Sequence, residues 1–435
     1  MRIPAARAAR LLAIPASAVG LEAVGLLRRL GGAPAADVRQ QLRTAHAQRT
    51  RRTLGQLKGG ALKAGQLLST VEALFPEDPE STWRHELVAL QEDNPPVAFA
   101  DIAAVLRQEM GSDWRAAFES FADEPVAAAS LGQVHRARMN GRDVAVKVQY
   151  PGIADAVAAD VGLLAVALRL AGLIAPGLAM PPLVAELRTR LAEELDYRHE
   201  GTTQQRFADA YSADPAVAVP QVRLALNRVL VTDWLEGEPL VRIAPGSPAA
   251  NAAGLAYQRF FLESPARVGL LHTDPHPGNF RWTADQRLGV LDFGSALSMP
   301  GGLPDTFGRL IRVLQGADGD AVLAGLHAGG FLRPGRTVEV DKLIDYLSPF
   351  TEPARHETFT YSREWLRSEF ARVNDPRNPE FAVALQLNLP AEHLFTHRVW
   401  LGIVGVLCQL HATVPVAAEL REWLPGFADE AATKD

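Results

Sequence analysis

Two carboxylates and one amide lie close together in the second half of the sequence. Only four residues separate Asp274 from Asn279, and Asp292 follows a short apolar run. Carboxylate and amide oxygens are ligands that Mg²⁺ takes while it also binds nucleotide phosphates. A carboxylate in such a set can orient or deprotonate an attacking hydroxyl group. The spacing therefore predicts a site for phosphoryl transfer, with Asp274 as the catalytic residue and Asn279 and Asp292 as metal ligands.

The same stretch allows a second interpretation. His272, Asp274 and His276 alternate, and His and Asp side chains are typical ligands of Zn²⁺ or Fe²⁺. On a regular strand these three side chains would share one face. Pro275 and Pro277 argue against a regular strand, and no further ligand cluster is evident elsewhere in the sequence. We therefore favour phosphoryl transfer and expect His276 to shape the loop through a hydrogen bond.

A lysine and a loop of small residues lie upstream of this stretch. Lys147 sits in an apolar strand pattern that follows the hairpin signal Asn140-Gly141. A buried ammonium group must be paired or contact a ligand, and kinases use a lysine on such a strand to hold the α and β phosphates. Small residues before the strand let backbone N–H groups approach a phosphate. The predicted nucleotide-binding positions in this loop are Ala127, Ala128, Ala129, Ser130 and Gln133.

A phosphate-holding lysine needs a carboxylate partner on a helix. The segment 186–200 has a strongly helical composition and carries several acidic residues. We assign Glu194 as the partner of Lys147. Glu193 remains the competitor, because neighbouring positions on a helix point about 100° apart and sequence spacing does not separate the two.

A strand, a short connector and a turn follow at residues 228–240. In a two-lobed kinase, a segment of this kind joins the lobes and hydrogen-bonds to adenine through its backbone. We predict that residues 233–237 form this hinge, with Asp233 and Leu235 at the nucleotide. The upstream parts therefore precede the Asp274 loop in the order that a kinase-like nucleotide site requires.

Composition excludes several classes of protein. The chain has 435 residues, of which 48% are hydrophobic and 22% are charged, which is typical of a globular protein with two or three domains. A net charge of −6 gives no nucleic-acid footprint, so we expect no nucleic-acid partner. Cys408 is the only cysteine, which excludes a disulfide framework and a CxxC zinc site and favours a reducing compartment.

Two segments bear on membrane contact. The apolar run 161–184 is interrupted by arginine and proline residues, so we interpret it as a buried helix or an insertion in a lobe. Residues 1–60 are rich in Ala, Leu and Arg with apolar positions at helical spacing. They predict basic amphipathic helices that lie on the protein itself or on anionic lipid headgroups. We expect a cytoplasmic location with peripheral membrane contact.

Taken together, the motifs resemble the UbiB/AarF family of atypical kinase-like proteins. The resemblance extends over residues 61–298, and its combination of a KxGQ motif with an alanine-rich loop does not occur in ordinary protein kinases. The matching motifs are Lys63-Ala64-Gly65-Gln66, the loop Ala127–Gln133, VAVKVQYPGI from Val144, Glu194-Leu195-Asp196, HTDPHPGN from His272 and LDFG from Leu291.

The resemblance implies an α+β, bilobal protein-kinase-like fold with an α-helical N-terminal extension. The extension would comprise residues 1–117. The N-lobe, with a helical insertion, would comprise residues 118–240, and the mainly helical C-lobe would comprise residues 241–435. In this family the KxGQ helix folds over the active site. Lys63 and Gln66 are therefore expected to be regulatory residues, with Asp196 as the acidic partner of Lys63.

The resemblance also implies a function. Family members bind ATP with Mg²⁺ or Mn²⁺, show ATPase activity and support isoprenoid quinone biosynthesis. We therefore expect an ATP-dependent phosphotransferase or ATPase that acts on a small molecule, a lipid or a quinone precursor. The stretch after Gly294 holds no APE-type element, which argues against a peptide substrate. The alternative is a nucleotide-gated, pseudokinase-like scaffold that binds lipid intermediates or partner enzymes.

Overall fold

The computed structural model describes residues 97–128, 131–155, 157–158, 195–316, 319–332, 338–375 and 394–428, together with 378, 383, 386 and 387. The chain divides into two compact units. Unit 1 comprises Met1–His199 and Val222–Trp234, and unit 2 comprises Glu200–Gln221 and Leu235–Asp435. The last passage between the units, at Trp234–Leu235, falls within the segment predicted as a hinge.

Unit 1 is built on an antiparallel sheet with the strand order β1-β3-β4-β7-β6, in which β2 pairs with β3. Its strands are β1 Ser120–Phe121, β2 Ala127–Ala128, β3 Gly132–Met139, β4 Arg142–Gln149, β6 Val222–Ala225 and β7 Val229–Asp233. Asn140 and Gly141 both adopt positive φ angles, of 49° and 74°, which suits the tight turn between β3 and β4.

One face of this sheet is apolar because β4 alternates. Val144, Val146 and Val148 are fully buried and pack with Ile102 and Leu106 of helix α5, Phe99–Met110. A short 3₁₀ helix, η1 Trp114–Ala117, adds Trp114 to the same core. The described residues before 118, which the sequence assigns to the N-terminal extension, thus share a core with the sheet.

A buried polar pair links α5 to this face. The Gln133 side chain accepts a hydrogen bond from the backbone N–H of Val97 at 3.0 Å and donates to Nε2 of His135 at 3.0 Å. The other ring nitrogen of His135 donates to the carbonyl of Ala122 at 2.8 Å. Burial lowers the pKa of His135, so the ring is held in its neutral form.

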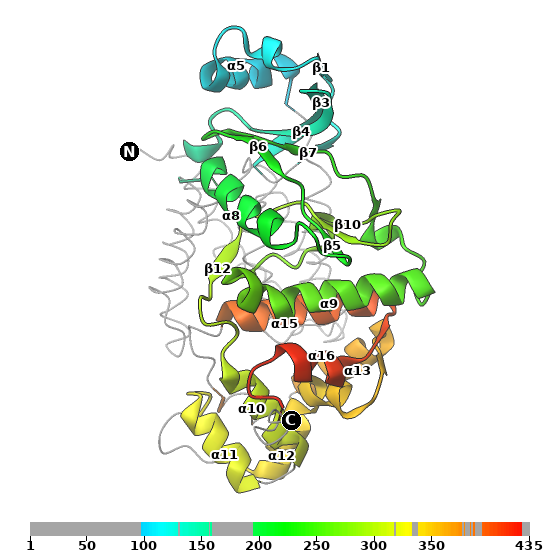
Figure 1. Cartoon of the computed structure of the whole chain (residues 1–435). Coiled ribbons are helices and arrows are strands. Elements are labelled where there is room, and N and C mark those ends of the chain that lie inside the picture. Colours follow the sequence, from blue (N-terminus) through cyan, green and yellow to red (C-terminus); the bar gives the residue numbers. More distant parts are fainter. Residues whose placement is uncertain are drawn as a thin grey trace, which may run out of the picture. The chain divides into compact units, whose positions relative to one another are not determined.

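Unit 2 is organised around helix α9, Pro248–Val268. The side chain of Ser247 caps its first turn by accepting from the N–H of Ala250, Pro248 begins it, and Gly269 ends it at a φ of 72°. The helix runs beside α15, Leu394–Leu410, and also packs on α16, Val416–Trp423 (Figure 1).

Short strands flank the loop of unit 2 that contains Asp274. Strands β5 Val217–Ala218, β11 Leu288–Val290, β10 Phe280–Trp282 and β8 Glu238–Pro239 form one sheet, in that order. Two further pairs are β9 Leu270–His272 with β12 Ala296–Ser298, and β13 Phe359–Thr360 with β14 Thr413–Val414. Helix α8, Tyr197–Ala210, and the 3₁₀ helices η2 Leu240–Arg242 and η3 Pro277–Asn279 complete this region. The mixture of helices and sheets confirms the α+β class.

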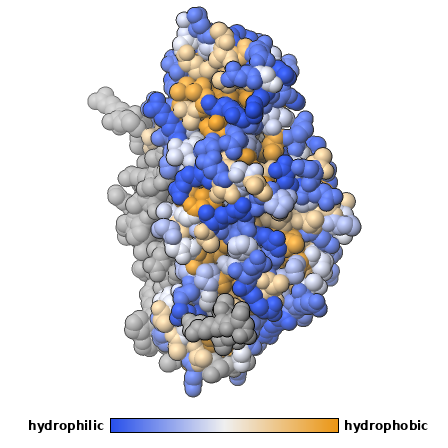
Figure 2. Space-filling view, in the orientation of Figure 1, coloured by the Kyte–Doolittle hydropathy of each residue, from blue (hydrophilic) through white to orange (hydrophobic). Residues whose placement is uncertain are grey.

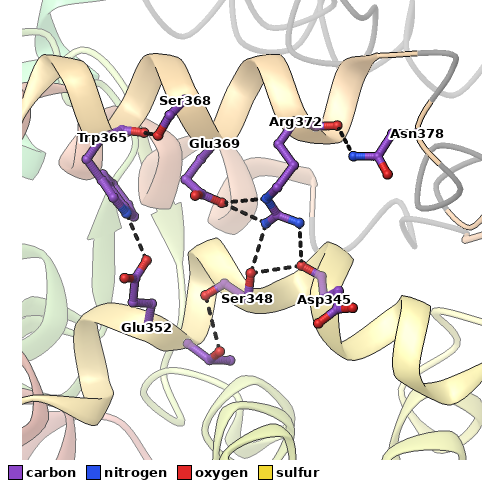
Figure 3. A network of polar contacts seen from close by, with 9 residues as sticks. Asp345, Ser348, Glu352, Trp365, Ser368, Glu369, Arg372 and Asn378 are labelled. Carbon is purple, nitrogen blue, oxygen red and sulfur yellow. Dashed lines mark hydrogen bonds and ion pairs between the residues drawn. The ribbon is translucent and has the colours of Figure 1, made fainter.

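Four helices follow the central region, and they are joined by both apolar and polar contacts. They are α10 Asp305–Gly316, α11 Gly319–Ala328, α12 Val340–Thr351 with its extension η4 Glu352–Arg355, and α13 Arg363–Asn374. Arg372 donates to Glu369, to the Oγ of Ser348 and to the carbonyl of Asp345, while the indole of Trp365 donates to Glu352 (Figure 3). This polar network fastens α13 to α12.

Two expectations from the sequence concern membrane contact and the single cysteine, Cys408. No helix in the described part of the chain is long and apolar enough to cross a bilayer. Hydrophilic residues cover most of the face in Figure 2, with apolar residues in separate patches. Cys408 in α15 is buried, and burial raises the pKa of its thiol to about 12.

Candidate active site

The loop between β9 and β10 brings Asp274 and Asn279 into contact. The Asn279 side-chain amide donates to Oδ2 of Asp274 at 2.9 Å, and it also approaches the Asp274 carbonyl at 3.4 Å. Pro277 starts the 3₁₀ turn η3, which ends at Asn279 and so turns that residue back toward Asp274. These hydrogen bonds use the amide nitrogen of Asn279, and its side-chain oxygen has no hydrogen-bond partner among the residues that the structure describes.

A single buried imidazole connects Asp274 with Asp292. His272 is fully buried, and its Nε2 donates to the carbonyl of Asp292 at 2.6 Å. Nδ1 then accepts from the backbone N–H of Asp274 at 3.3 Å. Burial, as the largest effect, lowers the pKa of His272, which favours the neutral ring that this pattern of one donor and one acceptor requires. Sequence reasoning gave His272 no structural role, although its place at the end of the apolar run Leu270-Leu271 was a signal of burial.

Further bonds join the Asp274 loop to the segment around Asp292. The N–H of Leu291 donates to the carbonyl of Asn279 at 2.9 Å, and the hydroxyl groups of Thr273 and Ser295 are 2.6 Å apart. Oδ1 of Asp292 accepts from the N–H of Gly294 at 3.0 Å. Unit 2 therefore links Asp274, Asn279 and Asp292 through hydrogen bonds of their backbones and of His272, and their catalytic and metal-binding roles stay predictions.

Two helices hold the loop from behind. The hydroxyl group of Tyr257 in α9 donates to the carbonyl of Pro275 at 2.5 Å. In α15, a β-carbon at Gly402 would lie 2.2 Å from Cγ of Pro275, so only glycine lets this helix approach the loop so closely. Burial, followed by the charge of Asp274, raises the pKa of Tyr257, which keeps the hydroxyl protonated. Sequence reasoning missed both residues because each lies far along the chain from Pro275.

The histidines of this loop have structural partners. Both ring nitrogens of His272 are used in hydrogen bonds, and Nδ1 of His276 accepts from the N–H of Gly278 at 3.1 Å. The expected shaping of the loop by His276 is thus confirmed. Within the described ranges, no group of three or more His, Cys, Asp or Glu residues is arranged to hold a metal ion. The arrangement therefore gives no support to a histidine-ligated Zn²⁺ or Fe²⁺ site.

Unit 1 presents Lys147 on a central strand. Lys147 lies on β4 between Val134 of β3 and Leu230 of β7, on the face opposite the apolar core. Its Nζ lies 4.9 Å from the centre of the Tyr197 ring, a distance at which an ammonium group is attracted to an aromatic face. The predicted strand position of Lys147 is confirmed.

The segment that follows Glu194 is held next to this lysine. The buried side chain of Gln149, two residues from Lys147 on the same face, donates to the carbonyl of Leu195 at 2.8 Å. Asp196 is exposed, and its Oδ1 accepts from the N–H of Arg198 at 3.0 Å. Glu194 itself stays a prediction. The predicted residues Lys63, Gln66, Ala129, Ser130, Glu193 and Glu194 lie outside the described residues.

The alanine-rich loop enters β3 through a close contact. Ala127 and Ala128 form β2 and pair with Val134 and Gln133, and both alanines are exposed. A β-carbon at Gly132 would lie 2.2 Å from the carbonyl oxygen of Val148, so this position requires glycine. The Gln133 side chain lies on the α5 face, opposite Lys147, so that only the backbone of Gln133 is available to a ligand on the lysine face.

The residues of the predicted hinge are held mainly by their neighbours within each unit. In unit 1, the carboxylate of Asp233 accepts two hydrogen bonds from Arg223, at 2.7 and 2.6 Å. In unit 2, Leu235 packs so tightly over Gly289 that a β-carbon there would lie 2.1 Å from Cδ2 of the leucine. The Asp233 side chain is thus occupied, and a contact to adenine stays a prediction for the backbone.

The sequence itself matches a known family. Residues 89–323, more than half of the chain, match the model described as the ABC1 atypical kinase-like domain. This chain belongs to the ABC1 atypical kinase-like family. Apart from the KxGQ motif at Lys63, the motifs that indicated a UbiB/AarF protein all lie within that matched region, so the resemblance is confirmed.

Several proteins are similar to this ABC1 family chain. "Atypical kinase COQ8B, mitochondrial" of Danio rerio is 30% identical over 336 residues, which cover 74% of this chain and 53% of that protein. "Atypical kinase COQ8, mitochondrial" of Saccharomyces cerevisiae is 27% identical over 398 residues, which cover 88% and 76%. The chain spans about half the length of several of the curated relatives that it matches.

A solved structure shows the same fold. The complex of Rv3197 with erythromycin from Mycobacterium tuberculosis has a TM-score of 0.69 and 36% sequence identity, and the match covers 91% of this chain and 100% of that chain. The kinase-like fold expected from the sequence is therefore confirmed for this member of the ABC1 family.

Proposed function

We propose that this chain is an ATP-dependent phosphotransferase or ATPase that binds ATP with Mg²⁺ or Mn²⁺. It acts on a small molecule, a lipid or water, in support of isoprenoid quinone biosynthesis, rather than on proteins. One observation carries the proposal: the Asn279 amide contacts the Asp274 carboxylate at 2.9 Å, and neutral His272 bonds to the backbones of both Asp274 and Asp292. Membership of the atypical kinase-like family supports it.

Four residues of unit 2 have roles in this proposal: Asp274, Asn279, Asp292 and His272. Asp274 orients the acceptor hydroxyl group or water and accepts its proton. Asn279 and Asp292 hold the metal ion, since an amide oxygen and a carboxylate suit a hard cation that keeps several waters. The bound metal ion supplies positive charge that offsets charge on the phosphates. His272 keeps the carboxylates of Asp274 and Asp292 in register because it bonds to the backbone of each residue.

The predicted residues of unit 1 and of the hinge bind the nucleotide in this proposal. Lys147 holds the phosphates, Glu194 positions Lys147, and the backbone of Ala127–Gln133 covers the phosphates. Asp233 and Leu235 contact adenine through their backbones. Lys63, Gln66 and Asp196 regulate access to the site. A peripheral contact with anionic lipid and a quinone precursor as the acceptor complete the proposal.

Steady-state ATP hydrolysis tests this function. The protein is assayed with Mg²⁺, with and without vesicles that contain phosphatidylglycerol, beside Asp292→Asn and Lys147→Ala. Removing one electrostatic contact of this kind raises a barrier by roughly 3 kcal/mol, so turnover should fall on the order of 100-fold in either variant. Asp285→Asn is the matched control, because this carboxylate is exposed in the turn between β10 and β11, where it pairs with Arg287.

The outcomes separate the two functional classes. Turnover that falls on the order of 100-fold in both variants and persists in Asp285→Asn supports the enzyme. Nucleotide binding without turnover, with or without vesicles, would instead support a nucleotide-gated scaffold. Erythromycin, the ligand named for the Mycobacterium tuberculosis neighbour, forms an additional arm, since an effect on nucleotide binding would extend that interaction to this chain.

A further inference from the structure

Tyr197 connects Lys147 with the end of the acidic motif at residues 194–196. It is the first residue of α8 and follows that motif directly. Its side chain is buried, and the centre of its ring lies 4.9 Å from Nζ of Lys147. An aromatic face attracts an ammonium group at this distance, and does so more strongly where water is excluded. The ring therefore acts on the charged end of Lys147, whereas strand β4 determines only the face on which this flexible side chain lies.

The hydroxyl end of the same ring lies over the end of the alanine-rich loop. A β-carbon at Gly132 would lie 3.0 Å from Oη of Tyr197. Gly132 pairs with Gln149, and Val134, two residues further along β3, pairs with Lys147. These four positions share one face of the sheet because side chains alternate along a strand. Tyr197 thus reaches from one part of the predicted phosphate site to the other, from the loop to the lysine.

The sheet holds the backbone on either side of this ring. The N–H of Tyr197 donates to the carbonyl of Asn227 at 3.1 Å. The carboxamide of Gln149, which is buried on the lysine face, donates to the carbonyl of Leu195 at 2.8 Å and lies 3.5 Å from the carbonyl of Asn227. A ring that is already fixed loses little freedom when a charged group rests against it. Unit 1 therefore presents the ring to Lys147 in a preorganised position.

The two main apolar cores do not account for the burial of Tyr197. Among the residues that the structure describes, it belongs neither to the core between α5 and the sheet nor to the core around α9. The first of these cores lies on the opposite face of β4, with Val146 and Val148. An aromatic side chain that packs beside a strand lysine, away from the apolar cores, is suited to hold a charge in place.

We propose that Tyr197 is a positioning residue that holds the ammonium group of Lys147 beside the end of the alanine-rich loop. The inference rests on the proposed function, in which Lys147 holds the phosphates of ATP. A lysine ammonium group on its flexible stem samples many positions. The ring restricts these positions, so less freedom is lost when the phosphates bind. Tyr197 acts through Lys147 and needs no contact with the nucleotide.

A double-mutant cycle tests this role through nucleotide affinity. Binding of a non-hydrolysable ATP analogue with Mg²⁺ is measured by calorimetry. Tyr197→Leu removes the ring and should weaken the affinity about tenfold, whereas Tyr197→Phe keeps the ring and should weaken it by at most about threefold. In the Lys147→Ala background, Tyr197→Leu should change the affinity by less than about twofold, because a residue that acts through the lysine then has nothing to act on.

Phe118→Leu is the matched control for loss of a ring. Phe118 is buried in the core on the α5 face of the same unit, so its variant should stay within about twofold of the parent affinity. Equal losses from Tyr197→Leu with and without Lys147 would overturn the inference and leave the proposed function standing. A parent protein that binds no nucleotide would overturn the proposed function and the inference together, so the two failures are distinguishable.

A second measurement needs neither nucleotide nor loss of the ring. Lysine side chains are methylated with ¹³C-labelled methyl groups, and the NMR signal that is absent from Lys147→Ala identifies Lys147. The face of the Tyr197 ring should shift this signal upfield, and the shift should remain in Tyr197→Phe and disappear in Tyr197→Leu. An unshifted signal in the parent protein would overturn the inference, even if Tyr197→Leu did not fold.

Discussion

Lys147 in unit 1 and the Asp274 loop in unit 2 are positioned in different ways. Lys147 lies on a regular central strand, so the alternation of β4 alone decides which face its side chain occupies. The loop around Asp274 has no such regularity. It depends on His272 behind it, Tyr257 from α9 and Gly402 from α15. A strand can carry a functional side chain by itself, whereas an irregular loop needs specific partners from distant parts of the chain.

Removing the buried imidazole should have the largest effect. His272→Ala leaves the Asp292 carbonyl and the Asp274 N–H without their partner and opens a cavity, which costs about 3–5 kcal/mol of unfolding free energy. Chemical denaturation measures this loss, with His327→Ala on the exposed side of α11 as the control. A loss below about 1 kcal/mol would show that the loop holds its shape without this residue.

Overpacking the loop should have the next largest effect. A β-carbon in Gly402→Ala would meet the Pro275 ring at 2.2 Å, so either α15 or the loop must shift, at a cost of about 1–3 kcal/mol. ATP turnover should fall while nucleotide affinity stays near that of the parent protein. Gly405→Ala on the same helix is the matched control, because no atom lies within 4 Å of a β-carbon there. Equal turnover in the two variants would contradict the role given to α15.

Tyr257→Phe removes one hydroxyl group and keeps the ring. The Pro275 carbonyl then lacks its buried donor, so stability should fall by about 1–2 kcal/mol, and kcat should fall more than KM changes. Thermal unfolding and steady-state kinetics provide the two readouts. A change in KM alone would mean that Tyr257 does not position the loop.

The pH dependence of stability should be the most gradual effect, because it accumulates over several pH units. Burial lowers the pKa of His135 in unit 1 and of His272 in unit 2. The unfolded chain therefore binds protons that the folded chain does not bind once the pH falls below the ordinary histidine pKa of about 6.5. Stability should then decrease by up to about 1.4 kcal/mol per pH unit for each histidine. Denaturation curves from pH 7.5 to 5 test this slope, which His135→Gln should flatten; an unchanged slope would contradict it.

The sequence predicts the parts of the site that depend on local patterns. Prolines and glycines around Asp274 indicate a loop, the Asn140-Gly141 turn indicates a hairpin, and alternation places Lys147 on a strand. The same patterns indicate the family, which the comparisons confirm. Tyr257 and Gly402 were not predictable, because a contact between segments so far apart depends on how helices pack. The side-chain direction of Gln133 was missed because the strand begins one residue before it, at Gly132.

The position of Cys408 makes the opening of helix α15 measurable by thiol labelling. Helix α15, whose Gly402 packs against the loop around Asp274, also carries the chain's single thiol, which is buried in the core. A thiol reagent can modify the protein only when this helix opens, and every modified molecule then carries its label at one known atom. The labelling rate under native conditions therefore measures how often α15 leaves the loop, and ligands that close the loop should slow it.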